Sequence, residues 1–193
     1  MNYESNRTFT NYIHKNLAIP TIYTRLGWEE IKTDAAVLDY IDRMCGIDYF
    51  FRDSAKKVIT VQERFRTNYY AKYDDFTIRY HSGDDATNIH YKSEYYKIRA
   101  DYMIYGIVNC DKLNYVHNCT EFLKIVLVDL RQLYLQIDSG LIQIGNTKTA
   151  VTPLIKCEVK YNTEDKKSFV AFDIPKLIAH FGNTIIKKRL GYD

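Results

Sequence analysis

Apolar side chains near the start of the chain recur at the spacing of a helix. In residues 9–17 they stand three or four positions apart, which places them on one face. Pro20 follows, and the residue before a proline disfavours helical backbone angles. We therefore predict a first helix over residues 9–17 that ends before Pro20.

A second helical pattern occupies residues 35–45 and has a clear beginning and end. Asp34 precedes it and can accept hydrogen bonds from the first free N–H groups. Gly46 follows it and can adopt the left-handed conformation that closes a helix. The pattern predicts a helix between these two residues, with Asp42 in its last turn.

Later segments are rich in Val, Ile, Tyr and Phe, which favours strands. The predicted strands are residues 47–52, 58–66, 76–80 and 102–108. Residues 53–56 read Asp-Ser-Ala-Lys, a sequence typical of a turn. We therefore expect the first two strands to form a hairpin.

The last third of the chain mixes both kinds of pattern. Residues 120–137 carry a wide apolar face at helical spacing, and we predict the longest helix of the protein there. Strand patterns follow at 151–161 and 169–172, and a final helix is expected between Asp173 and Gly182. The whole order predicts an α/β (α+β) fold with a mixed central sheet flanked by helices.

Length and composition favour one domain over residues 1–193. The chain is 46% hydrophobic, enough for one substantial core, and has no internal repeat or proline- and glycine-rich linker. No window approaches the roughly 18 consecutive apolar residues of a membrane span, and the N-terminus lacks the layout of a signal peptide. We expect a soluble cytoplasmic protein without membrane contact.

The cysteines are far apart and form no Cys-x-x-Cys pair. Cys45, Cys110, Cys119 and Cys157 are expected to be unpaired, buried side chains in a reducing intracellular compartment. No zinc site is predicted, because no ligand set of the usual spacing exists.

The distribution of charge says more than its sum. The formal net charge is only +3, too small to indicate nucleic-acid binding by itself. Basic residues nevertheless alternate with tyrosines over residues 64–99. The candidates for neutralising phosphates and stacking on bases are Arg66, Tyr69, Tyr70, Lys72, Tyr73 and Arg79. The same composition also suits an antiparallel sheet with solvated charges outside, so both interpretations stay open.

Asp48, Gln62 and Arg64 are the residues best suited to carry chemistry. Asp48 stands near the start of one predicted strand, while Gln62 and Arg64 lie two positions apart, and so on one face, of the next. A divalent metal that activates water against a phosphodiester needs oxygen ligands, with a cation nearby. Glu63 is the reserve acid, although alternation puts it on the opposite, apolar face.

The stretch from Gly46 to Arg64 resembles the PD-(D/E)XK, or restriction-endonuclease-like, superfamily. In that family an Asp begins one strand and an acid-x-Lys motif follows on the next. Asp48 matches the first position, and Gln62 and Arg64 stand where the acid and the lysine would be. Asp42 matches an acid that often joins from the preceding helix. Weaker candidates for that role are Asp39, Glu29 and Glu30.

The resemblance is specific only over residues 42–66. It implies a restriction-endonuclease-like core and a nuclease that hydrolyses DNA with Mg²⁺ or Mn²⁺. The catalytic candidates are then Asp48, Gln62, Glu63 and Arg64, and the metal ligands Asp42, Asp48 and Gln62.

The chain departs from the family pattern at two positions. Gln62 keeps a neutral oxygen ligand in place of the acid, but Arg64 stays protonated and cannot act as a base. A second interpretation is therefore a catalytically inactive nuclease-like fold, of phage or mobile-element type in a bacterial host, that binds nucleic acid or a protein. A third is an unrelated interaction protein with a tyrosine-rich surface. The oligomeric state stays open, a homodimer included.

Overall fold

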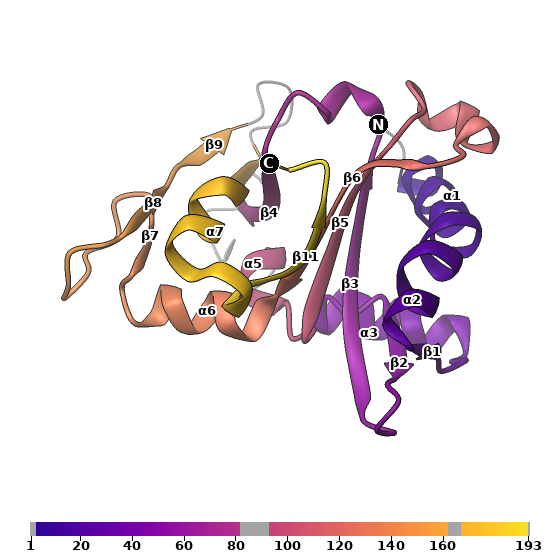
Figure 1. Ribbon diagram of the computed structural model, residues 1–193, viewed down its shortest axis with the longest axis horizontal. Coiled ribbons are helices and arrows are strands. Elements are labelled where there is room, and N and C mark those ends of the chain that lie inside the picture. The colour runs from indigo at the N-terminus through magenta and orange to yellow at the C-terminus, as the bar shows by residue number, and fades with distance from the viewer. Residues whose placement is uncertain (1–2, 82–92, 162–166, 193) are drawn as a thin grey trace.

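The structure, a computed structural model, describes residues 3–81, 93–161 and 167–192. Its centre is a six-stranded mixed sheet in the order β1-β2-β3-β5-β6-β11 (Figure 1). These strands are β1 (Glu29–Glu30), β2 (Tyr49–Arg52), β3 (Val58–Arg66), β5 (Tyr102–Val108), β6 (Phe122–Asp129) and β11 (Ile186–Leu190). β3 and β5 run parallel, and the other neighbouring pairs are antiparallel. The predicted mixed α/β architecture is confirmed.

Helices lie against both faces of this sheet (Figure 1). One face is covered by α1 (Tyr3–Ile13), η1 (His14–Tyr23) and α2 (Thr24–Leu26), and the other by α6 (Leu130–Asp138) and α7 (Ile174–Phe181). The side chains of β3 alternate between the two sides. Val61 and Phe65 pack into the cluster that contains Phe9 of α1. Gln62 and Arg64 therefore face the second side.

Two smaller sheets, of three and two strands, accompany the central sheet. β4 (Asp75–His81) pairs with β10 (Ser168–Asp173), which also pairs with β9 (Val159–Tyr161). β7 (Ile142–Ile144) runs parallel to β8 (Ile155–Cys157). The predicted strand at 76–80 exists but belongs to a small sheet, where Phe76 stacks on Phe172. The prediction of one strand at 151–161 is wrong for residues 151–154, which form no strand. The remainder is broken at Glu158, where the chain changes its pairing partner from β7 to β10.

Helix ends follow their capping residues. α3 (Ala35–Cys45) begins after Asp34, whose carboxylate accepts hydrogen bonds from two backbone N–H groups, and ends at Gly46 with φ of 56°. α7 likewise begins after the cap Asp173 and ends at Gly182. Both predicted helices are confirmed. Their ends could be predicted because capping depends on only a few neighbouring residues.

The helix predicted at 120–137 is wrong in its first half. Residues 122–129 form β6, and only the rest forms α6, which Asp129 caps through a 3.1 Å hydrogen bond from the N–H of Gln132. β6 lies inside the sheet between β5 and β11, and its last four residues are all buried. A strand covered on both faces is apolar throughout, so its periodicity cannot be told from that of a helix.

The first helix also differs from its prediction, because it continues through Pro20. Residues 14–23 form a π-helix that contains this proline. A wider turn accommodates a residue without an N–H group. The N–H of Thr24 donates to the carbonyl of Ile19, five residues back, which is the hydrogen bond of that wider turn.

Cys110 and Cys119 form a disulfide, with Cα atoms 5.2 Å apart, so the prediction that all cysteines are unpaired is wrong for these two. The short helix η3 (Leu113–Asn118) folds the chain back and brings them together. Cys45 and Cys157 are free. Because disulfides are rare in reducing compartments, Cys110 and Cys119 do not support the predicted reducing compartment.

Within the described ranges, no helix has both the length and the apolar character that crossing a membrane requires.

Candidate functional site

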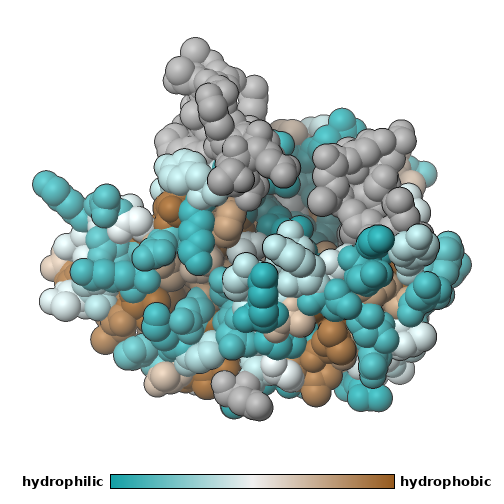
Figure 2. All heavy atoms as spheres, turned by 90° about the horizontal axis from the view of Figure 1, so that it is seen from above, coloured by the Kyte–Doolittle hydropathy of each residue, from teal (hydrophilic) through white to brown (hydrophobic). Residues whose placement is uncertain are grey.

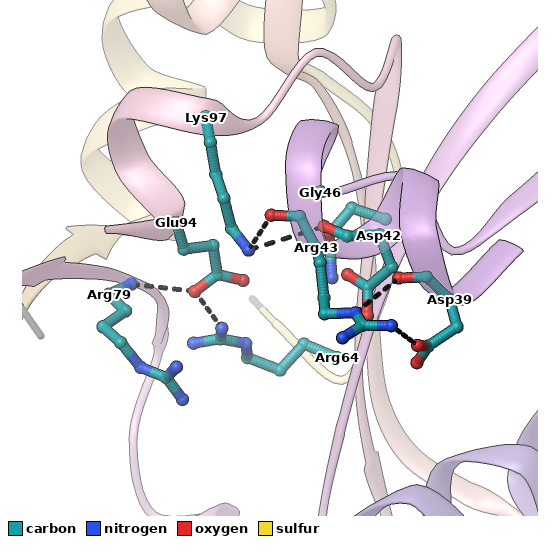
Figure 3. Close-up of a pocket in the computed structure, with 9 residues that line it drawn as sticks. Asp39, Asp42, Arg43, Gly46, Arg64, Arg79, Glu94 and Lys97 are labelled. Carbon is teal, nitrogen blue, oxygen red and sulfur yellow. Dashed lines mark hydrogen bonds and ion pairs between the residues drawn. The ribbon is translucent and has the colours of Figure 1, made fainter. Parts of the chain in front are cut away.

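A pocket of about 350 Å³ opens between α3, the β2–β3 hairpin, β4 and the short helix α5 (Glu94–Lys97) (Figure 3). Its walls carry charges of both signs. The lining residues are Asp39, Asp42, Arg43, Gly46, Gln62, Arg64, Arg79, Glu94 and Lys97. The fold thus gathers around one space Asp42, Gln62 and Arg64, which the sequence proposed for one site, together with Arg79, which it proposed for binding nucleic acid. Asp48 is not among the lining residues.

Asp48 lies one residue before β2 and is held against β3. Gln62 Nε2 donates a hydrogen bond of 2.8 Å to Asp48 Oδ2, and the N–H of Glu63 donates one of 2.6 Å to the same oxygen. The N–H of Asp48 in turn donates to the carbonyl of Val61 at 2.9 Å. The predicted hairpin therefore exists, and it brings Asp48 into contact with Gln62.

The charge of Asp42 acts on Asp48. Burial raises the pKa of Asp48 well above its usual value, and the negative charge of Asp42 raises it further. Burial also raises the pKa of Asp42, while the ammonium of Lys97 lowers it. Two neighbouring carboxylates that resist ionisation form a place where a bound cation is favoured, since an opposite charge stabilises the ionised form.

The oxygen atoms here suit a hard divalent cation. Asp42 and Asp48 supply carboxylates. Gln62 supplies Oε1, a buried atom without a hydrogen-bond partner among the residues that the structure describes. In the described segments no group of three or more His, Cys, Asp or Glu side chains is placed to hold a metal. Mg²⁺ commonly binds one or two carboxylates and completes its shell with water and substrate phosphate, which fits this smaller donor set.

Arg64 shares the face of Gln62, as predicted, but its guanidinium is already engaged. Nη1 donates to the carbonyl of Thr77 at 3.0 Å, and Nη2 pairs with the carboxylate of Glu94. Burial would raise the pKa of Glu94, but the charge of Arg64 and the N–H of Arg79 outweigh it and lower that pKa. Arg64 is therefore a fixed cation at the pocket wall.

Glu94 is a functional candidate that sequence reasoning missed, and Lys97 counted there only as one of the basic residues of 64–99. They stand one helical turn apart on α5, and both line the pocket (Figure 3). Lys97 Nζ donates to the carbonyl of Arg43 at 2.9 Å, at the end of α3. The only local signal was an acid and a lysine spaced three apart in a short helix, which by itself points to no site.

Asp39 and Arg43 close one side of the pocket. Asp39 forms ion pairs with both Arg7 and Arg43, and the hydrogen bond from Arg7 lowers its pKa. A carboxylate held by two guanidinium groups is poorly available to a metal. Asp42 therefore remains the better helix acid of the two.

Glu63 points to the other face of β3. Its Oε1 accepts a hydrogen bond of 2.5 Å from the hydroxyl of Tyr23 and hydrogen-bonds to His14 Nδ1 at 2.8 Å. The His14 ring stacks on Tyr49 with centroids 3.5 Å apart, and Glu30 Oε2 lies 3.8 Å from His14 Nε2. The reserve acid thus belongs to a buried network under η1, away from the pocket.

The predicted nucleic-acid residues fall in two places. Arg79, from β4, lines the pocket. The others continue beyond the pocket along the end of β3 and the turn after it, namely Arg66, Tyr69, Tyr70, Lys72 and Tyr73. Lys72 Nζ lies 4.4 Å from the centroid of the Tyr69 ring and 5.2 Å from that of Tyr73.

No protein-family model, curated protein or solved structure matches this chain.

Proposed function

We propose that the chain is a divalent-metal-dependent nuclease that hydrolyses DNA phosphodiester bonds in the pocket between α3, the β2–β3 hairpin and α5. The observation that carries the proposal is the contact between Asp48 and Gln62, with Asp42 acting on the same carboxylate. Oxygen donors from adjacent elements, beside fixed cations, are what metal-assisted phosphodiester hydrolysis requires. In this proposal α3 and the hairpin belong to a restriction-endonuclease-like core.

Asp42, Asp48 and Gln62 would hold Mg²⁺ or Mn²⁺. When bound, the ion would polarise the phosphate and activate a water molecule for attack. The raised pKa values of Asp42 and Asp48 supply an electrostatic reason for binding, because the ion would relieve the cost of their ionisation. Binding should accordingly release protons.

In this proposal the cations of the pocket bind the substrate phosphate and stabilise its negative charge. Arg64 is oriented by Glu94 and by the carbonyl of Thr77, so its guanidinium needs little reorganisation to stabilise negative charge that develops on the substrate. Lys97 brings an ammonium to the same pocket from α5. In this proposal Lys97, on α5, takes the role of the motif lysine, whose position on β3 is occupied by Arg64.

A cleavage assay with Mg²⁺ or Mn²⁺ on plasmid and branched DNA tests this function. Asp48→Ala should reduce cleavage by about a hundredfold, because the metal loses a charged ligand. Asp138→Ala, at an exposed aspartate outside the pocket, is the matched control and should keep full activity. Cleavage that survives Asp48→Ala would remove Asp48 from the site.

A binding-only protein is the second candidate, and the Arg64–Glu94 pair favours it. A guanidinium that is already neutralised by a carboxylate has less charge to offer a transition state. A protein of this kind would retain DNA in the presence of a chelator and would cleave it with no metal. Gel-shift and cleavage assays on the same DNA separate the two candidates.

A further inference from the structure

The segment after β3 carries exposed aromatic rings beside cations. Tyr69 is 63% exposed and Tyr73 is 44% exposed. The ammonium of Lys72 lies against both rings. No carboxylate pairs with Lys72 in the part of the chain that the structure describes. We call Tyr69, Lys72 and Tyr73 the tyrosine platform.

The platform is built on a fixed backbone. The N–H groups of Ala71 and Tyr73 donate to carbonyls three residues back, at 2.9 and 3.1 Å. The N–H of Asn68 donates to the carbonyl of Cys110 at 2.9 Å, and Lys124 Nζ donates to the carbonyl of Tyr73 at 3.2 Å. These rings are therefore presented by an ordered turn, which lowers the entropy lost on binding.

Arg66 lies between the pocket and the platform, on the same face of β3 as Gln62 and Arg64. Its guanidinium sits 5.3 Å from the centre of the Tyr70 ring. Its Nε is buried and has no hydrogen-bond partner among the described residues. Burial and the charge of Arg64 both lower its pKa. A partly buried cation without a paired carboxylate is a place where an anion is favoured.

Gln62, Arg64 and Arg66 follow one another along one face of β3, in the direction that leads from the pocket to the tyrosine platform. From Gln62 to Arg66 is four residues, or about 13 Å along a strand, which is close to four nucleotides of a stacked single strand at roughly 3.4 Å each. The backbone segment after β3 crosses the end of the sheet (Figure 1). The molecule seen from this end is covered mainly by hydrophilic side chains, with smaller hydrophobic patches between them (Figure 2).

We propose that this surface binds single-stranded DNA beside the pocket: Arg66 takes a backbone phosphate, and Tyr69 and Tyr73 stack on unpaired bases. Bases in a duplex are already stacked and cannot lie on such rings, whereas every unpaired base has a free face. The inference rests on the proposed function, and it names the substrate class as DNA with an unpaired strand next to the cleaved bond.

Binding without metal tests the platform separately from hydrolysis. Fluorescence anisotropy in a chelator would compare a labelled oligothymidine with a duplex of the same length. Changing both tyrosines, Tyr69→Leu with Tyr73→Leu, should weaken single-strand binding by at least about thirtyfold, since each stacked base contributes about fivefold or more, whereas the matching Phe pair should bind like the unchanged protein. Tyr161→Leu, at a tyrosine that is 67% exposed on β9, is the matched control and should change nothing.

Arg66→Met should weaken binding and reduce the slope of log affinity against log salt by about 0.7, the value expected for one lost phosphate contact on a single strand. Asp138→Ala, at an exposed aspartate outside the pocket, should bind the single strand normally. If no metal supports cleavage while the Leu pair still loses affinity, the platform stands and the proposed hydrolysis fails.

If cleavage proceeds and the Leu pair binds the single strand as well as the unchanged protein, the platform is wrong and the proposed hydrolysis stands. A preference for duplex over single strand would also overturn the platform. So would the absence of any oligonucleotide binding, which would leave a protein as the partner of this surface.

Discussion

Gln62 donates a hydrogen bond of 2.8 Å to Asp48 across the β2–β3 hairpin. The partner of the Asp48 carboxylate is therefore a neutral amide and not another carboxylate. Burial and the charge of Asp42 already disfavour the ionised form of Asp48. A third negative charge at this place would add to that cost. The amide therefore lets the fold tolerate the site without a bound cation.

Asp48→Asn should stabilise the protein at neutral pH. A carboxyl group whose pKa is raised on folding binds its proton more tightly in the folded chain, so its ionisation destabilises the fold as the pH rises above the usual carboxyl range. Asparagine removes the charge and keeps an oxygen for the N–H of Glu63. We expect a gain on the order of 1 kcal/mol at pH 7 that shrinks toward pH 4, measured by thermal unfolding. A lower melting temperature of the variant at pH 7 would contradict this.

Gln62→Glu should make stability depend more strongly on metal. Without metal, the new carboxylate beside Asp48 should cost about 1 to 2 kcal/mol of unfolding free energy. With Mn²⁺ it should gain more than the unchanged protein does, because a ligand that binds only the folded state stabilises it in proportion to its affinity. Thermal unfolding with and without Mn²⁺ measures both effects. Gln136→Glu, on α6, is the control, and equal Mn²⁺ shifts in all three proteins would refute the site.

Removing one partner of the Arg64–Glu94 pair should be costly. The side chain of Arg64 is 15% exposed and that of Glu94 is 9% exposed, so Glu94→Ala leaves a largely buried charge unpaired. We expect a loss of about 3 kcal/mol of unfolding free energy in denaturant titrations, and a smaller loss in the double variant Arg64→Met with Glu94→Leu. Lys176→Ala breaks an exposed pair with Asp173, whose two side chains are 62% and 42% exposed, and should cost less than about 1 kcal/mol. Additive losses in the double variant would show that the two residues do not act as a pair.

The His14 network should make stability fall as the pH rises through the neutral range. Burial lowers the pKa of His14, but its hydrogen bond to Glu63 and the charges of Glu63 and Glu30 outweigh burial and raise the pKa above its usual value. The protonated imidazole therefore stabilises the fold fully below about pH 6.5, and this contribution is lost as the pH rises through the raised value. Urea titrations between about pH 6 and pH 8 should show the decline.

His14→Gln should flatten that decline, because the ring that binds the proton is gone. His180→Gln, at an exposed histidine on α7, should leave the slope as it is. An unchanged slope in His14→Gln would assign the pH dependence to other groups.

Gly46→Ala should damage the site as well as the fold. Gly46 has φ of 56°, and an added Cβ would lie 2.8 Å from Ile98 Cγ1 and 3.2 Å from Gln62 Oε1. Gly27 has a similar φ of 68°, but its added Cβ would meet nothing within 4 Å. Both alanines pay the strain of a left-handed residue, about 1 to 2 kcal/mol. Gly46→Ala should cost roughly 1 to 3 kcal/mol more through overpacking, and it should also lower cleavage. Equal unfolding free energies for the two variants would contradict the clash at Gly46.

Much of the fold was predictable because its signals are local. The strands at 58–66 and 102–108 were identified at their observed bounds, and the helices after Asp34 and Asp173 at theirs. Alternation along β3 also predicted that Gln62 and Arg64 share one face and that Glu63 takes the other. Capping and alternation act over two to four residues, so a short stretch of sequence contains all the information they need.

The rest depended on partners that are distant in sequence. Residues 122–129 became a strand because β5 and β11 pair with them on either side, and that pairing is absent from the segment itself. The sequence predicts Arg64 as a catalytic cation but gives no sign of its partner Glu94, which lies 30 positions further along the chain. Lys97 reaches the end of α3 across 54 positions.

The sequence alone therefore determined the α/β class, the β2–β3 hairpin and the face of β3 that Gln62 and Arg64 share. Only the tertiary structure decided which charges close the pocket and which cysteines are joined. The physical reason is that a side chain's local conformation depends on its neighbours in the chain, whereas the pKa and pairing of a buried charge depend on whatever the fold packs against it.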